Sequence, residues 1–138
     1  MRPRDAFAIC HEIYEVAREL VNGRVPTTQV ELPSKFLWRP DLHPRLVEYL
    51  ADFARAGERA LEGRKRQPRS SSRLILFRMY FLGGAEYEAA RRTMGISERT
   101  WADWADEIRD VVGRELLRAG ICPPARYFRE TSPRRVRR

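Results

Sequence analysis

Long hydrophobic runs, cysteines, histidines and lysines are all scarce in this sequence of 138 residues. No stretch of about 18 apolar residues occurs, which excludes a helix that spans a membrane. Charged side chains between His11 and Glu19 interrupt the first apolar segment, which excludes a secretory signal there. The two cysteines, Cys10 and Cys122, form no disulfide framework, which is typical of a reducing compartment. We therefore expect a cytoplasmic protein without a membrane partner.

Residue patterns of catalytic, cofactor and metal sites are also missing. The sequence has no glycine-rich loop of the kind that cradles phosphate, and no Ser-His-Asp or Cys-His arrangement. The four potential zinc ligands are Cys10, His11, His43 and Cys122. Their spacing matches no zinc finger or ribbon, so we expect no metal site. We also expect no cofactor and no enzymatic activity.

One group of carboxylates could in principle form a catalytic metal site. A single helix face is expected to carry Asp103, Asp106, Glu107 and Asp110. Carboxylates of this kind are able to hold a divalent cation, as in a nuclease. A salt-bridged helix surface is far commoner, and it is the interpretation that we adopt.

The pattern of apolar residues predicts an all-α fold, because no segment alternates apolar and polar residues over a strand's length. Apolar residues recur at spacings of three and four over residues 5–21, which end at Asn22-Gly23. Pro44 suits the first turn of a second helix, and Gly63 suits its end. Further helices are predicted over 74–82, over 85–94, and from Ser97 to Gly120.

Positive charge is concentrated in two segments. The chain has a net charge of +8, almost entirely from arginine. Residues 63–73 contain five cations and no acid, namely Arg64, Lys65, Arg66, Arg69 and Arg73. Residues 126–138 contain six arginines against Glu130, so each segment carries +5 and the rest of the chain −2. These segments are either solvated loops or arms that contact phosphates, and the motif between them favours the second interpretation.

The composition divides the chain into four parts. We expect a helical N-terminal part over 1–62, a basic linker over 63–73, a helix-turn-helix domain over 74–122 and a basic tail over 123–138. Within the first part, residues 24–43 are rich in proline and read as an irregular connection. Its apolar residues are expected to pack on the core, and these are Phe36, Leu37 and Trp38.

Residues 85–104 meet the requirements of a helix-turn-helix, which needs two helices joined by a short turn. The inner face of the first helix is formed by Tyr87, Ala90 and Met94. Gly95 permits the turn, Ile96 lies beneath it and Ser97 caps the second helix. Trp101 and Trp104 anchor that second helix. The side chains left pointing outward are Glu98, Arg99, Thr100 and Asp103.

The run G-I-S-E-R-T-W over 95–101 resembles the turn and recognition helix shared by sigma-factor region four and the LuxR-type response regulators. The likeness covers about residues 74–118. The overall layout, with the ending P-P-A-R-Y-F, is similar to phage late-gene regulators of the antitermination Q group. That resemblance implies a protein that binds DNA near a promoter and joins RNA polymerase to pass terminators. Small terminase subunits use similar domains.

The sequence departs from the sigma pattern at one position. The small residue of the first helix lies six positions before the serine in that pattern, and here this position holds Arg91. Either the turn is one residue longer, so that Ala90 takes the small-residue position, or the helix is rotated and Arg91 extends outward.

Acidic residues on the second helix oppose a nucleic-acid role, because residues 97–110 carry five acids and two arginines. Phosphate contacts are therefore expected from Arg91, Arg92 and the linker cations Arg64, Lys65, Arg66 and Arg69. Base contacts are expected from the first turn: Arg99 suits guanine O6 and N7, and Glu98 or Asp103 suits cytosine N4. The other acids either form a solvated face or dock a protein, and these are Asp106, Glu107 and Asp110.

The sequence thus predicts a transcription regulator that binds double-stranded DNA, with DNA contacts that include Ser97 and Thr100. Two alternatives stay open: a module that binds polymerase or terminase and uses the helix-turn-helix as a scaffold, and an RNA-binding protein. Tyr127 and Phe128 either stack on bases or pack on the helices, and we expect packing. Whether the chain forms a homo-oligomer is open.

Overall fold

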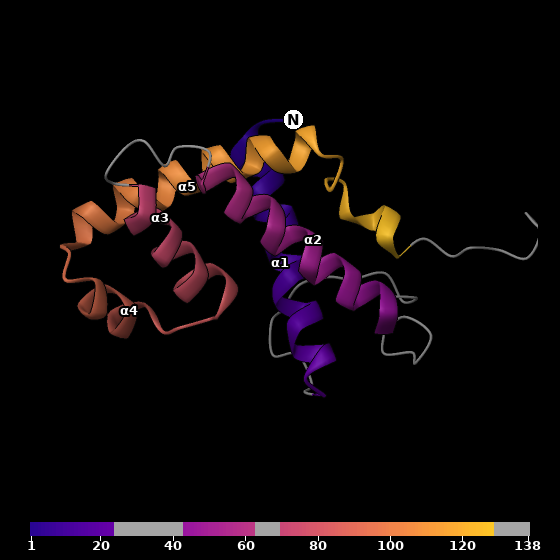
Figure 1. Ribbon diagram of the computed structural model, residues 1–138, viewed down its shortest axis with the longest axis horizontal. Helices are drawn as coiled ribbons and strands as arrows, with labels where there is room; N and C mark the ends of the chain where they lie inside the picture. The colour runs from indigo at the N-terminus through magenta and orange to yellow at the C-terminus, as the bar shows by residue number, and fades with distance from the viewer. Residues whose placement is uncertain (24–42, 63–69, 129–138) are drawn as a thin grey trace, which may run out of the picture.

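The computed structural model describes residues 1–23, 43–62 and 70–128, and within these ranges it is helical without a strand. This confirms the predicted all-α class. The elements are α1 (Pro3–Val21), α2 (His43–Glu62), α3 (Ser70–Leu76), the π-helix η3 (Phe77–Leu82), α4 (Tyr87–Met94), α5 (Glu98–Arg118) and the 3-10 helix η4 (Pro124–Tyr127). Helix α5 runs along the molecule, α1 and α2 cross beneath its C-terminal half, and α3 and α4 lie near its N-terminus (Figure 1). The predicted apolar connection with Phe36, Leu37 and Trp38 lies outside the described residues.

The ends of the helices follow the local signals in the sequence. Gly23 takes a left-handed conformation directly after α1, with φ of +75°, as its position after Asn22 predicts. Pro44 lies in the first turn of α2, and α2 ends one residue before Gly63. These confirmed boundaries depend on residues next to one another in the chain, which is why the sequence alone predicts them.

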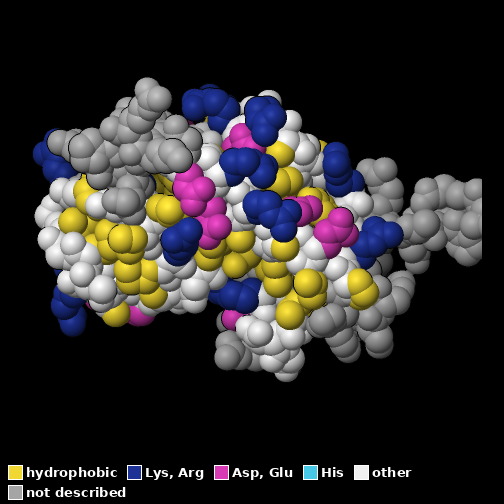
Figure 2. Space-filling model, in the orientation of Figure 1, with side chains coloured by type: hydrophobic (Ala, Val, Ile, Leu, Met, Phe, Trp, Pro, Cys, Tyr) yellow, Lys and Arg dark blue, Asp and Glu magenta, His cyan; other side chains and the backbone are white. Residues whose placement is uncertain are grey.

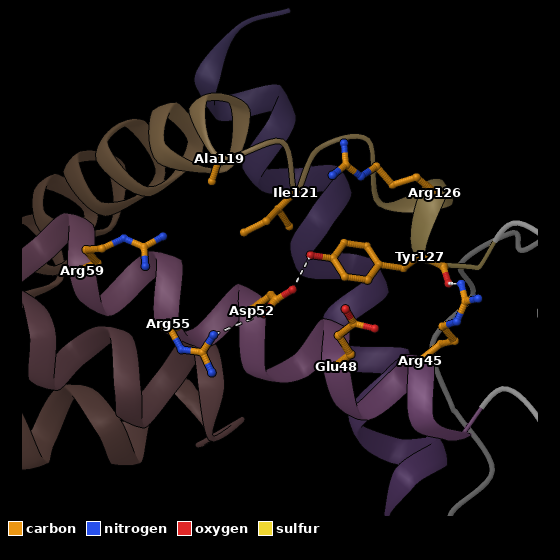
Figure 3. Close-up of a pocket in the computed structure, with 9 residues that line it drawn as sticks. All are labelled: Arg45, Glu48, Asp52, Arg55, Arg59, Ala119, Ile121, Arg126 and Tyr127. Atoms are coloured by element: carbon orange, nitrogen blue, oxygen red, sulfur yellow. Dashed lines mark hydrogen bonds and ion pairs between the residues drawn. The ribbon is translucent and has the colours of Figure 1, made fainter.

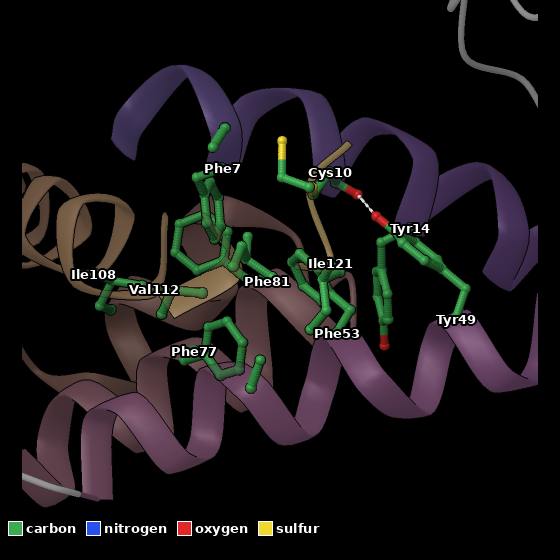
Figure 4. Packing of buried hydrophobic residues seen from close by; sticks show 14 of the residues in the cluster. Phe7, Cys10, Tyr14, Tyr49, Phe53, Phe77, Phe81, Ile108, Val112 and Ile121 are labelled. Atoms are coloured by element: carbon green, nitrogen blue, oxygen red, sulfur yellow. Dashed lines mark hydrogen bonds between the residues drawn. The ribbon is translucent and has the colours of Figure 1, made fainter. Parts of the chain in front are cut away.

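All the long helices contribute to one hydrophobic core (Figure 4). Phe53 of α2 lies at its centre, where its ring contacts Tyr14 at a centroid distance of 4.8 Å and Phe7 at 6.0 Å. On its other side the ring stacks on Phe77 of η3 at 6.3 Å. Aromatic pairs at these distances add to the stability that burial provides. The core therefore joins elements from both sides of the segment 63–73.

The predicted linker ends earlier than its charge indicates, because α3 begins at Ser70. Arg73 is only 8% exposed, although the sequence places it among the linker cations. Its guanidinium lies 4.5 Å from the centre of the Trp104 ring, and its Nε donates to Glu107 at 2.9 Å. A cation over a tryptophan face with a carboxylate partner is a stable arrangement for a buried arginine. Arg73 thus fixes the start of α3 against α5.

The C-terminal end of the π-helix is capped by side chains of α1. The last carbonyl groups of a helix lack partners within it and need donors from elsewhere. The Phe81 carbonyl is 2.8 Å from His11 Nε2, and the Leu82 carbonyl accepts from Tyr14 at 3.2 Å and from Arg18 at 2.7 Å. Because a carbonyl only accepts, His11 carries its proton on Nε2. These bonds hold the turn at residues 83–86 against α1.

We expect the stability of the protein to fall as the pH drops below about 6.5, the ordinary histidine pKa. Burial lowers the pKa of His11, and the nearby charges of Arg18 and Arg109 lower it further. The hydrogen bond to the Phe81 carbonyl and the charge of Glu15 raise this pKa, but burial outweighs them. A folded-state pKa below the unfolded one means that the unfolded chain binds the proton more readily. Stability is therefore complete above the unfolded pKa and decreases as the pH falls toward the folded one.

Urea denaturation between pH 7.5 and pH 5.5 measures this effect. His11→Gln keeps a donor for the Phe81 carbonyl but does not titrate, so its stability should change less over the interval. His43 is present in both proteins and cancels in the comparison. Equal pH dependence in the two proteins would contradict the assignment to His11.

Helices α1 and α5 approach closely at Gly113. A Cβ at this glycine would overlap the backbone carbonyl group of Pro3, so only hydrogen fits between the two helices. Arg4 reaches across the same crossing, and its Nε donates to Asp110 at 2.9 Å. This hydrogen bond raises the pKa of Arg4 and lowers that of Asp110. The first turn of α1 is therefore held on the middle of α5.

The segment after α5 returns to the core. Tyr127 and Phe128 both pack edge-on against Tyr49, with ring centroids 5.0 and 5.7 Å away. Phe128 is buried, which confirms the predicted packing of these aromatics on the helices. None of the helices in the described ranges is both long and apolar enough to pass through a lipid bilayer.

Candidate nucleic-acid interface

Helix α4 is a short helix with a defined cap at each end. The carboxylate of Glu86 accepts hydrogen bonds from the backbone N–H groups of Glu88 and Ala89, at 3.1 and 3.0 Å. These two bonds lower the pKa of Glu86. At the other end Gly95 is left-handed, with φ of +69°. The sequence correctly predicts that the helix ends just before Gly95. It places the start of the helix at residue 85 instead of Tyr87, because glutamate is an uncommon N-terminal cap.

A turn of three residues, 95–97, connects α4 to α5. Ser97 Oγ accepts from the Thr100 backbone N–H at 3.1 Å, which confirms the predicted cap. The same hydroxyl donates to Thr100 Oγ1 at 3.1 Å. Ser97 and Thr100 are predicted DNA contacts, but their hydroxyls are engaged with each other at the start of the helix.

The inner faces of α4 and α5 meet through aromatic residues and one alanine. The Tyr87 and Trp101 rings form an edge-to-face pair with centroids 5.2 Å apart, and Tyr80 contacts Trp101 in the same way at 5.0 Å. Ala90 is 1% exposed, so it lies on the buried face of α4. The tryptophan anchors predicted from the sequence are therefore in place, with Trp101 buried and Trp104 beneath Arg73.

Arg91 folds back onto the turn. One of its terminal nitrogens donates to the Ile96 carbonyl at 3.1 Å, and the other donates to Glu88 at 2.9 Å. The guanidinium also lies 5.8 Å from the centre of the Tyr87 ring. This conformation differs from the alternative in which the first helix is rotated and Arg91 extends outward. A phosphate contact by Arg91 would have to replace bonds that stiffen this turn.

The first two turns of α5 present an exposed ridge, which we call the α5 tip, formed by Glu98, Arg99, Ala102 and Asp103. No hydrogen bond or ion pair links these side chains to other described residues. Arg92 of α4 is exposed as well. Ala102 was not predicted as a site residue, although its spacing of three from Arg99 places it on the same face. Of the predicted contacts, Arg92, Glu98, Arg99 and Asp103 are thus exposed and make no hydrogen bond or ion pair with a described residue.

The acids further along α5 are all paired within the protein. Asp106 lies 3.1 Å from Arg109 and 3.8 Å from Arg4. Asp110 pairs with Arg4, and Glu107 with Arg73. These three carboxylates therefore connect α5 to α1 and α3, which confirms the adopted interpretation of a salt-bridged helix surface for them. Only Glu98 and Asp103 remain near the tip, where Arg92 and Arg99 balance them.

The strongest cluster of predicted phosphate contacts, Arg64, Lys65, Arg66 and Arg69, lies outside the described residues. Of the predicted tail over 123–138, residues 129–138 also lie outside them, whereas its start forms η4. The points where the segment 63–69 joins the fold are described. The segment follows Glu62, the last residue of α2, and precedes Ser70, the first residue of α3. Ser70 is one helical turn before Arg73, whose guanidinium lies over the Trp104 ring of α5. One end of the basic segment is thereby attached next to the N-terminal half of α5.

Of the four potential zinc ligands, from which the sequence predicts no metal site, the structure describes the side chains of Cys10, His11 and Cys122. Within the described ranges, no three His, Cys, Asp or Glu side chains are placed to hold a metal ion. Cys10 and Cys122 are both buried and unpaired. Burial, with a smaller contribution from Cys122, raises the pKa of the Cys10 thiol and keeps it protonated.

The α5 tip is accordingly a polar, exposed ridge on a rigid helix, next to the attachment of a basic segment. Its exposed carboxylates and guanidinium suit hydrogen bonding to an extended polar partner. Comparison with family models, with curated proteins and with solved structures found no match to this chain.

Proposed function

We propose that the protein binds double-stranded DNA in a sequence-specific manner and regulates transcription, with the α5 tip in the major groove. The observation that carries this proposal is the contrast along α5. The side chains of the α5 tip are exposed and make no hydrogen bond or ion pair with the described residues, whereas the acids from Asp106 onward are ion-paired to other helices. The N-terminal end of α5 is therefore available to contact a partner, whereas its later turns hold α1 and α3 in place.

The shape of the tip suits the major groove. The groove of B-DNA is about 12 Å wide and admits one α-helix, and recognition helices contact bases through their N-terminal residues. Arg99 is able to donate two hydrogen bonds to guanine O6 and N7. Ala102 offers a methyl group for contact with a thymine methyl, and Glu98 or Asp103 can accept from cytosine N4.

Charge supports the same orientation. DNA carries one negative charge for about each 1.7 Å of its axis, so an acidic helix would be repelled. Internal pairing of Asp106, Glu107 and Asp110 reduces that repulsion. The tip itself carries −1, which the exposed Arg92 of α4 balances. The cations of 63–69 then supply the electrostatic attraction from a segment attached beside α5.

The resemblance of residues 95–101 to sigma-factor and LuxR-type recognition helices is the reason to propose transcription as the process. The likeness of the layout to antitermination Q regulators extends the proposal to RNA polymerase as a partner. No separate observation in the described structure favours a protein-docking or RNA-binding role over this one, so both enter as outcomes of the experiment.

Arg99→Ala is expected to reduce discrimination at one base pair by about 1–3 kcal/mol, because a bidentate contact to guanine would be lost. Arg64→Ala and Arg66→Ala are expected instead to weaken binding to every duplex, and each should lower the salt slope by about one unit. Selection of bound duplexes from a random pool, followed by affinity measurements at several salt concentrations, checks both expectations.

Arg114→Ala is the matched control, because Arg114 is an exposed arginine on the same helix but distant from the tip. It should change neither the selected sequence nor its discrimination. If Arg99→Ala and Arg64→Ala have the same effect on sequence preference, the proposed division between base and phosphate contacts is wrong. A preference for structured RNA in competition, or a protein partner captured after nuclease treatment without any duplex binding, would replace the proposal.

A further inference from the structure

A polar pocket lies at the opposite end of α5 from the tip. It is formed between α2, the end of α5 and η4, and it has a volume of about 390 Å³. Pockets that hold small ligands have volumes of about 300–1,000 Å³. Four arginines line it, with Arg45, Arg55 and Arg59 on α2 and Arg126 on η4 (Figure 3). Cations thus face the pocket from two separate elements.

The arginines differ in how strongly the fold already uses them. Arg59 is bound to Glu115 at 3.2 Å, and Arg45 donates to the Tyr127 carbonyl at 3.0 Å. Arg55 is largely exposed, and its one ion pair with a described residue is the 3.4 Å contact with Asp52. Arg126 makes no hydrogen bond or ion pair with any described residue. Arg55 and Arg126 are therefore available to an incoming anion.

The acidic residues of the pocket do not cancel this charge. Asp52 accepts from the Tyr127 hydroxyl at 2.7 Å and from Arg55, so its carboxylate is already compensated. Burial and the bond to Asp52 raise the pKa of Tyr127, so the phenol stays protonated as a donor. Glu48 is the one other acid in the lining, and four arginines against two carboxylates leave the pocket at +2. The wider face over α2 shows the same mixture of basic and acidic side chains (Figure 2).

One side of the pocket is apolar. Ala119, Ile121 and the ring of Tyr127 line it across from Arg55 and Arg59 (Figure 3). The Tyr127 ring is held in place by its edge-on contact with Tyr49 and by its hydroxyl bond to Asp52. Guanidinium groups prefer phosphate oxygens in bidentate geometry, and an apolar wall favours a flat ring. The lining therefore matches a ligand that combines a phosphate group with a ring.

We propose that this pocket binds a phosphate-bearing ligand of mononucleotide size, with Arg55 and Arg126 holding the phosphate. The ring of the ligand lies against Ile121 and Tyr127, and the phosphate lies between α2 and η4. The nucleotide is either free or part of a nucleic-acid strand. The pocket is independent of the proposed groove contact, because α5, with its 21 residues, separates it from the tip by about 30 Å.

Calorimetric titration of the full chain in phosphate-free buffer tests the pocket with AMP, adenosine, inorganic phosphate and a short duplex. AMP should bind, inorganic phosphate should bind more weakly, and adenosine should not bind. Arg55→Ala and Arg126→Ala should each weaken AMP binding about tenfold, since each removes a hydrogen bond to a charged group. Arg126→Lys should retain part of the affinity, whereas Arg114→Ala should match the unmodified chain.

The duplex titration distinguishes a free nucleotide from the backbone of a nucleic-acid strand as the source of the phosphate. The Arg99→Ala variant distinguishes this pocket proposal from the proposed groove contact. If AMP does not bind but Arg55→Ala and Arg126→Ala weaken duplex binding, the strand backbone supplies the phosphate. If neither substitution changes binding of AMP, inorganic phosphate or duplex, the pocket proposal is overturned. Arg99→Ala should leave AMP binding unchanged, so a failure of groove recognition and a failure of this pocket give different results.

Discussion

Gly113→Ala is expected to lower the free energy of unfolding by about 3 kcal/mol, which is at the upper end of the usual cost of overpacking. The added Cβ would overlap the Pro3 carbonyl group, and backbone atoms yield less readily than a side chain. Helices α1 and α5 would have to separate at the crossing that Arg4 and Asp110 span. In an exposed helix the same change would raise stability by about 1 kcal/mol, because alanine is the better helix former.

Urea denaturation followed by far-ultraviolet circular dichroism measures this effect. Ala102→Gly is a suitable control, because Ala102 is exposed on the same helix and the change should cost only about 1 kcal/mol. The two substitutions add and remove the same methyl group at a crowded and an open position. A gain in stability for Gly113→Ala would show that the two helices do not approach as described.

Phe53→Ala is expected to cost about 3–5 kcal/mol, the usual range for removing a buried phenylalanine. Phe53 is fully buried, and its ring contacts α1 through Phe7 and Tyr14 and η3 through Phe77. A cavity at this point would loosen contacts on both sides of the segment 63–69. Because most small domains have total stabilities of about 5–15 kcal/mol, the variant should be marginally folded.

The same substitution tests whether the chain unfolds as one unit. Trp38→Phe leaves Trp101 and Trp104 as the fluorescent residues, and both lie on α5. In that background, fluorescence and circular dichroism should report one coincident transition, and Phe53→Ala should shift both equally. A fluorescence transition that stays in place while the helical signal shifts would indicate a separately stable domain over 74–122.

These stability predictions also bear on the proposed recognition surface. Gly113 and Phe53 lie where α5 is packed on α1 and α2, whereas the α5 tip extends beyond that contact. Substitutions at Arg99 should therefore change DNA binding without changing stability. The fold separates the part of α5 that supports the structure from the part that we propose to contact DNA.

Local features were predictable from the sequence by itself. The Ser97 cap, the left-handed Gly95 and the end of α1 at Gly23 depend on residues within one or two turns. The apolar spacing of α5 likewise indicates its buried face, and the exposed positions of Glu98, Arg99 and Asp103 follow from it. Such features can be predicted because each depends on backbone geometry and on residues nearby in the sequence.

The tertiary structure alone decided which charges are free and where the close contacts lie. The sequence treats Arg73 as a linker cation, but Arg73 is buried. It predicts a salt-bridged face on α5 without its partners, and the structure places those partners on α1 and α3. Arg4 and Asp110 are 106 positions apart, and the arginine pocket joins residues from α2 and η4. No periodicity encodes such pairs, because they depend on how the helices cross. That crossing is set by core packing, by Phe53 and by the missing side chain of Gly113.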